Sequence, residues 1–329
     1  MRRPGVILLL GLGVLLSSAH WSGAQWVRAG NPRGGWITAL AVSGANLFAA
    51  TREGGVFLSL DNGATWKAVN SGLPVEIDVQ CLAVIGTDIF AGTVGQGVFL
   101  SRDNGTSWIA VSAGLPEGCS VWHFEVSGEK LFAVAGAERA SVFLSSDSGT
   151  SWKEVNSGLP DTEVLCLAAC GRNLFVGTGT PLTGKDAAVF QSTDNGASWK
   201  VVNAGLPTQN PIYRFAVSET YIFAGTWGAG RVFRCRSSGA SWTPASAGLP
   251  DAMDFSLSDL AVSGTSLFLG SFRGVFLSTD DGASWAAINS GLPEEPSVYC
   301  LAISDTHLYA GTENGDVWRL PLSEIGSKK

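Results

Sequence analysis

The feature that most constrains this chain is a motif that recurs along it at a nearly constant interval. The motif Ser-x-Asp-x-Gly-x-x-Trp, called the box below, has five complete copies, and a sixth copy at Cys235–Trp242 has lost its Ser and Asp. The complete boxes are Ser59–Trp66, Ser101–Trp108, Ser145–Trp152, Ser192–Trp199 and Ser278–Trp285. The tryptophans of successive boxes lie 42 to 47 residues apart, the period of a four-stranded propeller blade. The spacing predicts an all-β propeller in one domain, although the length alone would suggest two domains.

Each repeat unit has the pattern of four strands closed by a turn. In the first unit the strands are expected at Trp36–Val42, Leu47–Thr51, Val56–Ser59 and Thr65–Val69, from their apolar and β-branched residues. A Gly-Leu-Pro triplet ends six of the units, the first at Gly72. Proline cannot donate to a β-ladder and glycine permits positive φ, so the triplet marks the crossing to the next blade.

The seventh unit is incomplete at its end. It begins at Val298 and stops after the expected strand Val317–Leu320, without a box. The segment Gln25–Gly30 matches the strand that follows each box, and its Trp26 precedes Trp66 by about one period. Pairing this segment with the last strand would remove the open edges of a linear array. We therefore predict a single seven-bladed propeller of four antiparallel strands per blade over residues 25–321, followed by a polar tail over 322–329.

The first 24 residues have the order of a secretory signal. Arg2 and Arg3 precede an apolar run over Gly5–Leu16, and small residues follow at Ser22 and Ala24, which is typical of an exported protein. We expect cleavage after Ala24 and a secreted or periplasmic monomer without stable membrane insertion; a retained N-terminal anchor is the alternative. Without the two arginines, 19 basic residues face 28 acidic ones, a balance that argues against nucleic acid as a partner.

These repeats resemble the Asp-box (BNR) repeat family, which includes sialidases, the sortilin ectodomain, family 74 glycoside hydrolases and photosystem II assembly-factor propellers. The resemblance covers nearly all of residues 25–320. It implies a β-propeller whose boxes lie on the face opposite the usual ligand site. It does not fix an activity, because the family combines enzymes with pure binding proteins.

The box aspartates have a structural interpretation rather than a catalytic or calcium-binding one. Each lies in a tight turn where its carboxylate can accept backbone N–H bonds, while the box glycine supplies the special φ and the tryptophan packs between blades. Five similar copies around a ring cannot all form one active site. The structural aspartates are Asp61, Asp103, Asp147, Asp194 and Asp280.

Six cysteines in an exported chain first suggest disulfides. However, Cys81, Cys166 and Cys300 occupy one repeat position in blades two, four and seven, so no two are neighbours, and a bridge needs Cα atoms within roughly 7 Å. The other three cysteines have no suitable partner either. We therefore expect free thiols, and the absence of Cys-x-x-Cys and the scarcity of histidine predict no metal site and no cofactor.

Function is expected where the repeats disagree, because positions that serve only the fold look alike in every copy. The repeats disagree most at the starts of the innermost strands and in the loops between second and third strands, including the long Gly179–Ala188 segment. In a propeller both regions open on one face around the central channel. The candidate ligand-binding residues are Trp122, His123, Tyr213, Arg214, Trp227, Arg231, Asp259, Phe272, Arg273 and Tyr299.

Aromatic faces with a few Arg and Asp side chains suit a sugar, a peptide or a protein loop. In blade five, Arg214 and Arg231 beside Tyr213 and Trp227 predict an electropositive sector that takes an anionic group of the ligand. We therefore expect an exported, non-catalytic binding or assembly propeller that holds a protein or glycan.

The alternative is a glycoside hydrolase or sialidase-like enzyme that uses the same face. Sialidases use a Tyr nucleophile with carboxyl groups and arginines, and Tyr299, Glu53 and Asp259 with three arginines can be assembled into such a set. However, the arginine motif that precedes the first box in sialidases has no match, and those enzymes have six blades. Family 74 enzymes pair two propellers, whereas this chain supplies one. A photosystem assembly role is implied by family analogy alone and requires a photosynthetic source.

Overall fold

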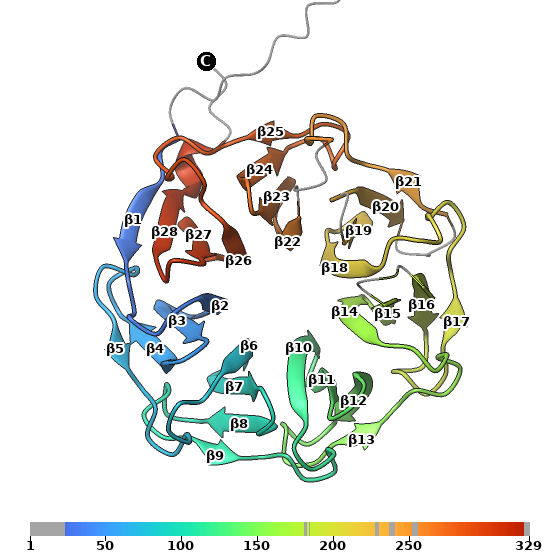
Figure 1. The fold of residues 1–329 in the computed structure, drawn as a ribbon, viewed down its shortest axis with the longest axis horizontal. Coiled ribbons are helices and arrows are strands. Elements are labelled where there is room, and N and C mark those ends of the chain that lie inside the picture. The colour runs from blue at the N-terminus through green and yellow to red at the C-terminus, as the bar shows by residue number, and fades with distance from the viewer. Residues whose placement is uncertain are drawn as a thin grey trace, which may run out of the picture.

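The computed structural model describes residues 24–180, 183, 185–227, 230–236, 241–251 and 256–325. Within these ranges, seven four-stranded antiparallel sheets stand around a common centre (Figure 1). The predicted fold, an all-β propeller of seven blades, is confirmed. The expected signal peptide lies outside the described residues, apart from Ala24. No helix in the described ranges is long and apolar enough to cross a membrane.

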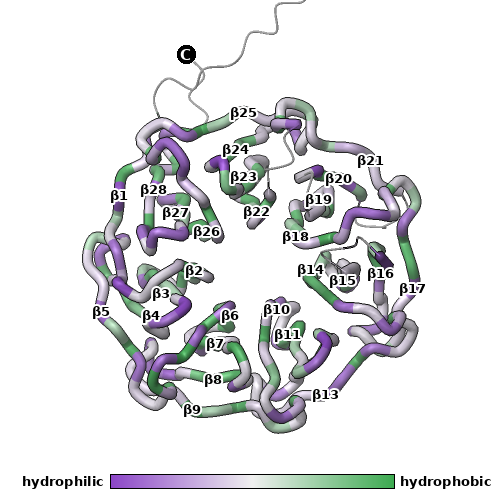
Figure 2. Tube along the Cα trace, viewed as in Figure 1, coloured by the Kyte–Doolittle hydropathy of each residue, from purple (hydrophilic) through white to green (hydrophobic). Residues whose placement is uncertain are grey.

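The two inner strands of each blade carry most of the core. The innermost strands are β2 (Ile37–Ser43), β6 (Val79–Ile85), β10 (Ser120–Ser127), β14 (Val164–Cys170), β18 (Ile212–Val217), β22 (Leu257–Ser263) and β26 (Val298–Ile303). The second strands are β3 (Asn46–Thr51), β7 (Asp88–Thr93), β11 (Lys130–Gly136), β15 (Asn173–Thr178), β19 (Tyr221–Thr226), β23 (Ser266–Ser271) and β27 (His307–Thr312). Each second strand buries one aromatic ring, which is Phe in six blades and Tyr309 in the seventh, with at most 1% of the residue exposed. Apolar residues recur on the strands around the ring (Figure 2).

The two outer strands of each blade are shorter. The third strands are β4 (Gly55–Ser59), β8 (Val98–Ser101), β12 (Ser141–Ser145), β16 (Ala188–Ser192), β20 (Val232–Arg236), β24 (Gly274–Ser278) and β28 (Val317–Pro321). The outermost strands are β5 (Lys67–Ala68), β9 (Ile109–Ala110), β13 (Lys153–Glu154), β17 (Lys200–Val201), β21 (Thr243–Pro244), β25 (Ala286–Ala287) and β1 (Val27–Gly30). The sequence predicted a longer fourth strand from Thr65. The strand begins only at Lys67 because the backbone N–H of Thr65 is bonded to Asp61 within the box turn, at 2.8 Å.

The chain closes the ring with its N-terminal strand, as predicted. Strand β1 pairs antiparallel with β28, and the Arg28 side chain bonds to Asp316 at 2.6 Å, 288 residues away in sequence. Figure 1 shows the blue strand β1 beside the red strand β28. Beyond residue 321, a short 3₁₀ helix follows at Leu322–Glu324, and Leu322 packs against the core of the seventh blade.

The boxes form compact turns between third and outermost strands. In the second blade, Asp103 Oδ1 accepts hydrogen bonds from the Ser101 hydroxyl and the Ser107 N–H, both at 2.8 Å, and Oδ2 accepts one from the Ser107 hydroxyl at 2.6 Å. Gly105 has a φ of 80°, which favours glycine. The hydrogen bonds from Ser107 lower the pKa of Asp103, because they favour the charged carboxylate. Each box carboxylate is therefore engaged inside its own turn.

The tryptophans that end the boxes join neighbouring blades. Trp108 is 3% exposed, and its indole N–H donates to the Val69 carbonyl of the preceding blade at 2.6 Å. Four other box tryptophans and Trp26 repeat this contact. The exception among the described residues is Trp66, whose buried indole nitrogen has no partner. It lies at the seam between the seventh and first blades, where β1 shifts its register against β28 after Arg28.

Candidate binding site at the centre of the ring

Every innermost strand begins with a β-bulge. In blade three, for example, the register between β10 and β11 shifts between Val121 and His123, and the other six blades show the same shift. A bulge leaves one residue outside the ladder and re-aims its side chain. The bulged residues are Thr38, Gln80, Trp122, Leu165, Tyr213, Ser258 and Tyr299. The variable positions found in the sequence therefore begin at the bulges.

The bulged residues meet the loops between second and third strands. The rings of Tyr213 and Trp227 are 4.7 Å apart and nearly perpendicular, and those of Phe272 and Tyr299 are 5.4 Å apart. The two variable regions of the sequence thus share one face of the ring, as expected. We call the side chains of these bulges and loops the mouth.

Three aromatic residues from three blades form a continuous arc in the mouth. Tyr299 of blade seven lies between Phe272 of blade six and Trp36 of blade one, with a centroid distance of 5.1 Å to Trp36. The guanidinium of Arg52 lies over the Trp36 ring at 4.8 Å and 4.0 Å from the Asp78 carboxylate. We call Trp36, Tyr299 and Phe272 the aromatic arc. The sequence predicted its last two members but not Trp36, which was treated only as the first residue of a strand.

The predicted arginine pair of blade five is divided between two environments. Arg231 lies 2.5 Å from Asp251 in a half-exposed ion pair. Arg214 instead lies over the Tyr213 ring at 4.2 Å, donates to the Tyr213 carbonyl at 2.9 Å, and is 3.9 Å from Asp259. Arg214 therefore combines an internal carboxylate partner with an aromatic neighbour.

Arg214 stands on β18, the innermost strand of blade five, and its charge affects groups in other blades. Burial raises the pKa of the Cys81, Cys166 and Cys300 thiols, and the charge of Arg214 opposes that shift in all three. Burial also lowers the pKa of His123 to about 4, and Arg214 adds to this effect. These four groups belong to four different blades.

The acidic side chains near the axis are bonded to the backbone. Asp259 accepts hydrogen bonds from the Leu260 N–H at 2.9 Å and, in the next blade, from the Leu301 N–H at 2.8 Å. Glu125 accepts one from the Ala169 N–H of the next blade at 2.9 Å. Burial raises the pKa of Glu125 to about 7. The sequence analysis missed Glu125, although the two-residue period of a strand places it on the same side as His123.

Other inner-strand side chains also bond to the next blade. His123 Nε2 lies 2.9 Å from the Leu167 carbonyl, which only accepts, so Nε2 carries the proton. The Cys81 thiol donates to the Val121 carbonyl at 3.4 Å. Equivalent bonds to the following blade come from Thr38, Cys166, Ser258 and Cys300. All six cysteines are buried and none is in a disulfide, in agreement with the prediction of thiols.

Two further predicted residues are Trp122 and Arg273. Trp122 is 46% exposed, and the Arg273 backbone N–H donates to the Ser271 hydroxyl at 3.1 Å. Within the described ranges, no group of three or more His, Cys, Asp or Glu side chains is placed to hold a metal ion. The long loop over 179–188 includes residues outside those ranges, as does the worn box of blade five.

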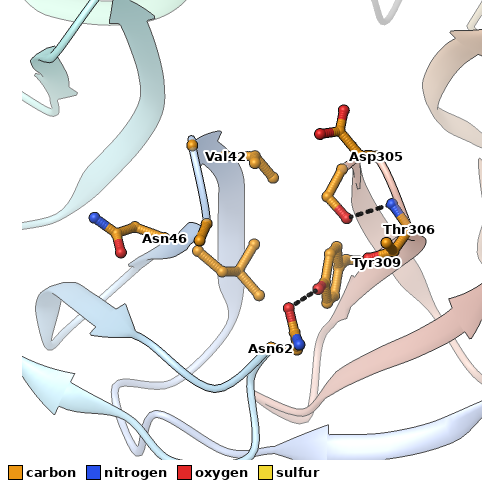
Figure 3. Close-up of a pocket in the computed structure, with 10 residues that line it drawn as sticks. Val42, Asn46, Asn62, Asp305, Thr306 and Tyr309 are labelled. Atoms are coloured by element: carbon orange, nitrogen blue, oxygen red, sulfur yellow. Dashed lines mark hydrogen bonds between the residues drawn. The ribbon is translucent and has the colours of Figure 1, made fainter.

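A separate pocket lies beside the seam, away from the mouth (Figure 3). Its volume is about 230 Å³, and it is lined by turns of the seventh and first blades. The Tyr309 hydroxyl lies 3.2 Å from Asn62 Oδ1 there. Because Asn62 belongs to the first box, this pocket lies on the box face and shares no lining residue with the mouth.

Comparisons with known proteins show the fold. No family model matches the chain, and no curated protein matches its sequence. It is similar to the structure of YCF48 bound to D1 peptide, with 12% identity and a TM-score of 0.69 over 90% of this chain and 96% of that one. It also resembles the GH74 xyloglucanase from Xanthomonas campestris, with 18% identity and a TM-score of 0.69 over 93% of this chain and 55% of that one. For the RRP9 WD40 repeats the identity is 17% and the TM-score 0.69, over 91% and 97% of the two chains. At these identities the comparisons establish a seven-bladed β-propeller among neighbours of varied function.

Proposed function

We propose that this protein is an exported, Asp-box-type propeller that binds a segment of a partner protein at its mouth. The observation that carries the proposal is the distribution of side chains around the axis. Aromatic groups from five blades surround the mouth, whereas Glu125 and Asp259 bond to backbone N–H groups. The aromatic residues are Trp36, Trp122, Tyr213, Trp227, Phe272 and Tyr299. Aromatic side chains with few free charges are typical of protein-binding surfaces.

The carboxyl groups favour binding over glycoside hydrolysis. A glycosidase needs one carboxyl group to protonate the leaving oxygen and a second to attack or to activate water. Both oxygens of Asp259 accept backbone N–H bonds, one of them across a blade boundary. A carboxylate held in this way joins two blades. The neighbour YCF48, whose structure contains a D1 peptide, supports a peptide as the ligand by analogy of fold.

The position of Arg214 supports an anionic group on the ligand. Its guanidinium lies over the half-buried Tyr213 ring and has one carboxylate partner at 3.9 Å, longer than a hydrogen bond. Guanidinium groups bind carboxylates through charge-assisted hydrogen bonds. An acidic side chain or a terminal carboxylate of the partner would bind Arg214 from the mouth.

The test compares peptide, glycan and glycosidase probes on the exported protein. We expect binders on an array of acidic and neutral dodecapeptides and no turnover in a panel of fluorogenic glycosides. Arg214→Ala should weaken binding of the best acidic peptide by roughly ten- to a hundredfold, because a charge-assisted bond typically contributes about 1.5–3 kcal/mol. The matched control is Arg102→Ala, which removes a guanidinium that pairs with Asp88 on the box face and should leave affinity unchanged. Glycoside turnover that Asp259→Asn abolishes would replace this proposal with a hydrolase.

A further inference from the structure

We propose that the aromatic arc binds an extended peptide through one bulky apolar side chain and through backbone carbonyl groups. This inference rests on the proposed function and specifies the chemistry that the site selects. It assigns the apolar part of the ligand to blades six, seven and one, and the acidic part to Arg214 near the axis.

The tilt of the rings favours a side chain over a sugar. Sugars stack on an open, flat aromatic face. In the arc, Tyr299 is tilted by 39° against Trp36 and by 38° against Phe272, at centroid distances of 5.1 and 5.4 Å. Arg52 covers part of the Trp36 ring. The rings therefore pack against one another and present no single flat face, and Phe272 at the blade-six end is 36% exposed. A leucine, methionine or phenylalanine side chain can pack on such an uneven apolar surface.

The polar groups of the arc match a peptide backbone. Within the described ranges, neither the Trp36 indole N–H nor the Tyr299 hydroxyl has a hydrogen-bond partner, and neither atom is among the buried, unpartnered ones. Neither donor is therefore fully buried. Burial raises the pKa of Tyr299, and the charge of Glu313 raises it further, which keeps its hydroxyl protonated and able to donate. An extended backbone offers carbonyl acceptors and N–H donors in alternation, which complements this set.

The arc adjoins the anion-binding sector. The pKa of Tyr299 is raised in part by Tyr213 of blade five, whose ring lies under Arg214. Tyr213 and Tyr299 occupy the same bulged position in blades five and seven, and only blade six separates them, so one extended peptide can contact both sectors. The acidic group and the apolar anchor of the ligand are therefore close together in its sequence.

The experiment selects dodecapeptides from a random phage-displayed library on the intact protein and measures the best synthetic peptide by calorimetry. We expect a bulky apolar residue near an acidic one in the selected peptide. Trp36→Ala should weaken this peptide at least roughly thirtyfold, and Tyr299→Phe, which removes only the hydroxyl, roughly five- to tenfold. Leu60→Ala, which truncates a 72% exposed side chain on the box face, is the control and should change affinity less than about twofold.

A double-mutant cycle assigns the partner of the arc. Replacing the apolar residue of the peptide with alanine should weaken binding to the wild type but hardly to Trp36→Ala, because the two changes remove one contact. The loss of binding free energy from the same replacement should add fully to the loss from Arg214→Ala. If Trp36→Ala fails to fold, Trp36→Phe keeps the ring, removes the N–H and should still weaken binding roughly fivefold.

The results separate this inference from the proposed function. If peptides bind with dependence on Arg214 but not on Trp36 or Tyr299, the arc is not the apolar subsite and only this inference fails. If a glycan binds instead and its binding depends on Trp36, the arc is a sugar site. If no peptide in the library binds, or if no mouth variant affects binding, the proposed function fails as well.

Discussion

The two faces of this propeller use repeated positions in opposite ways. On the box face, the distance from the second carboxylate oxygen to a Ser or Thr hydroxyl is 2.6 Å in all five complete boxes. At the mouth end of the innermost strands, one repeat position is occupied in turn by Ala39, Cys81, His123, Cys166, Arg214, Asp259 and Cys300. The box side chain bonds within its own turn, so the five blades with a complete box have the same residue there. The inner-strand side chain contacts another blade or solvent, so each blade can differ.

The most severe test of this contrast removes part of the repeated framework and leaves the mouth intact. A chain that begins at Pro32 lacks β1 with its ladder to β28 and also the preceding Trp26, which is 2% exposed. We expect loss of cooperative unfolding and aggregation through the bared edge, measured by calorimetry and size-exclusion chromatography against a chain that begins at Ala24. Equal melting temperatures would mean that closure by β1 is dispensable.

A smaller effect is expected from opening one box. Asp103→Ala leaves the Ser101 and Ser107 donors without their acceptor and should lower Tm by roughly 3–8 °C, with ligand affinity retained. Because the pKa of Asp103 is lowered in the fold, its contribution is present above about pH 4 and is lost as the pH falls further. The Tm difference from wild type should therefore shrink below that pH.

The control for Asp103→Ala is Asp88→Ala in the same blade. Asp88 forms only a surface ion pair with Arg102 at 3.5 Å, so its loss should shift Tm by less than roughly 2 °C. A stable Asp103→Ala protein without ligand binding would place the site on the box face and reverse the comparison.

Glu125 on β10, the innermost strand of blade three, provides a test through the pH dependence of stability. Burial raises its pKa to about 7, so the protonated form is favoured in the fold. The stability that protonated Glu125 contributes is fully present below the pKa of the unfolded state, about 4.3, and is lost as the pH rises through 7. Glu125→Gln should therefore stabilise the protein at pH 8 by about 1–2 kcal/mol and have little effect at pH 4. Chemical denaturation at both pH values measures this, and a variant equally destabilised at both would show that the charged form is the one the fold needs.

The smallest effect on stability is expected at the rim. Trp122 is bulged and 46% exposed, so Trp122→Ala should change the free energy of unfolding by less than about 0.5 kcal/mol. Peptide affinity should nevertheless fall, because Trp122 belongs to the mouth. A large loss of stability would mean that the aromatic residues of the mouth serve the fold after all.

The fold could be predicted from sequence because its signal is repeated. Six copies of one spacing fix the blade, and the position of Trp26 one period before Trp66 indicated the closing strand. The length of the outermost strands could not be predicted, since the box turn competes for the same backbone groups. The unpartnered indole of Trp66 depends on the register shift of β1, and no residue type signals that shift.

The site could be predicted only as a set of variable positions. The disagreement between repeats found Tyr299 and Phe272, but Trp36 was assigned to a strand although it stands two positions before the bulged Thr38. The position of Arg52 over Trp36 and the separation of Arg231 from Arg214 depend on loop conformations. Contacts such as that of Trp36 with Tyr299 cross a blade boundary, and a repeat pattern describes only what happens inside one blade.

The seam between β1 and β28 also determines when folding of the molecule can be completed. Six blades form from neighbouring segments, but the seventh must join residues such as Arg28 and Asp316, which are 288 positions apart. Loop-closure entropy grows only with the logarithm of that separation, so the join costs little stability but delays folding. Until it forms, the edge of β28 is open to other chains. During synthesis, the amino-terminal strand therefore stays unpaired until the last blade is made, and the protein is most prone to aggregate in this interval.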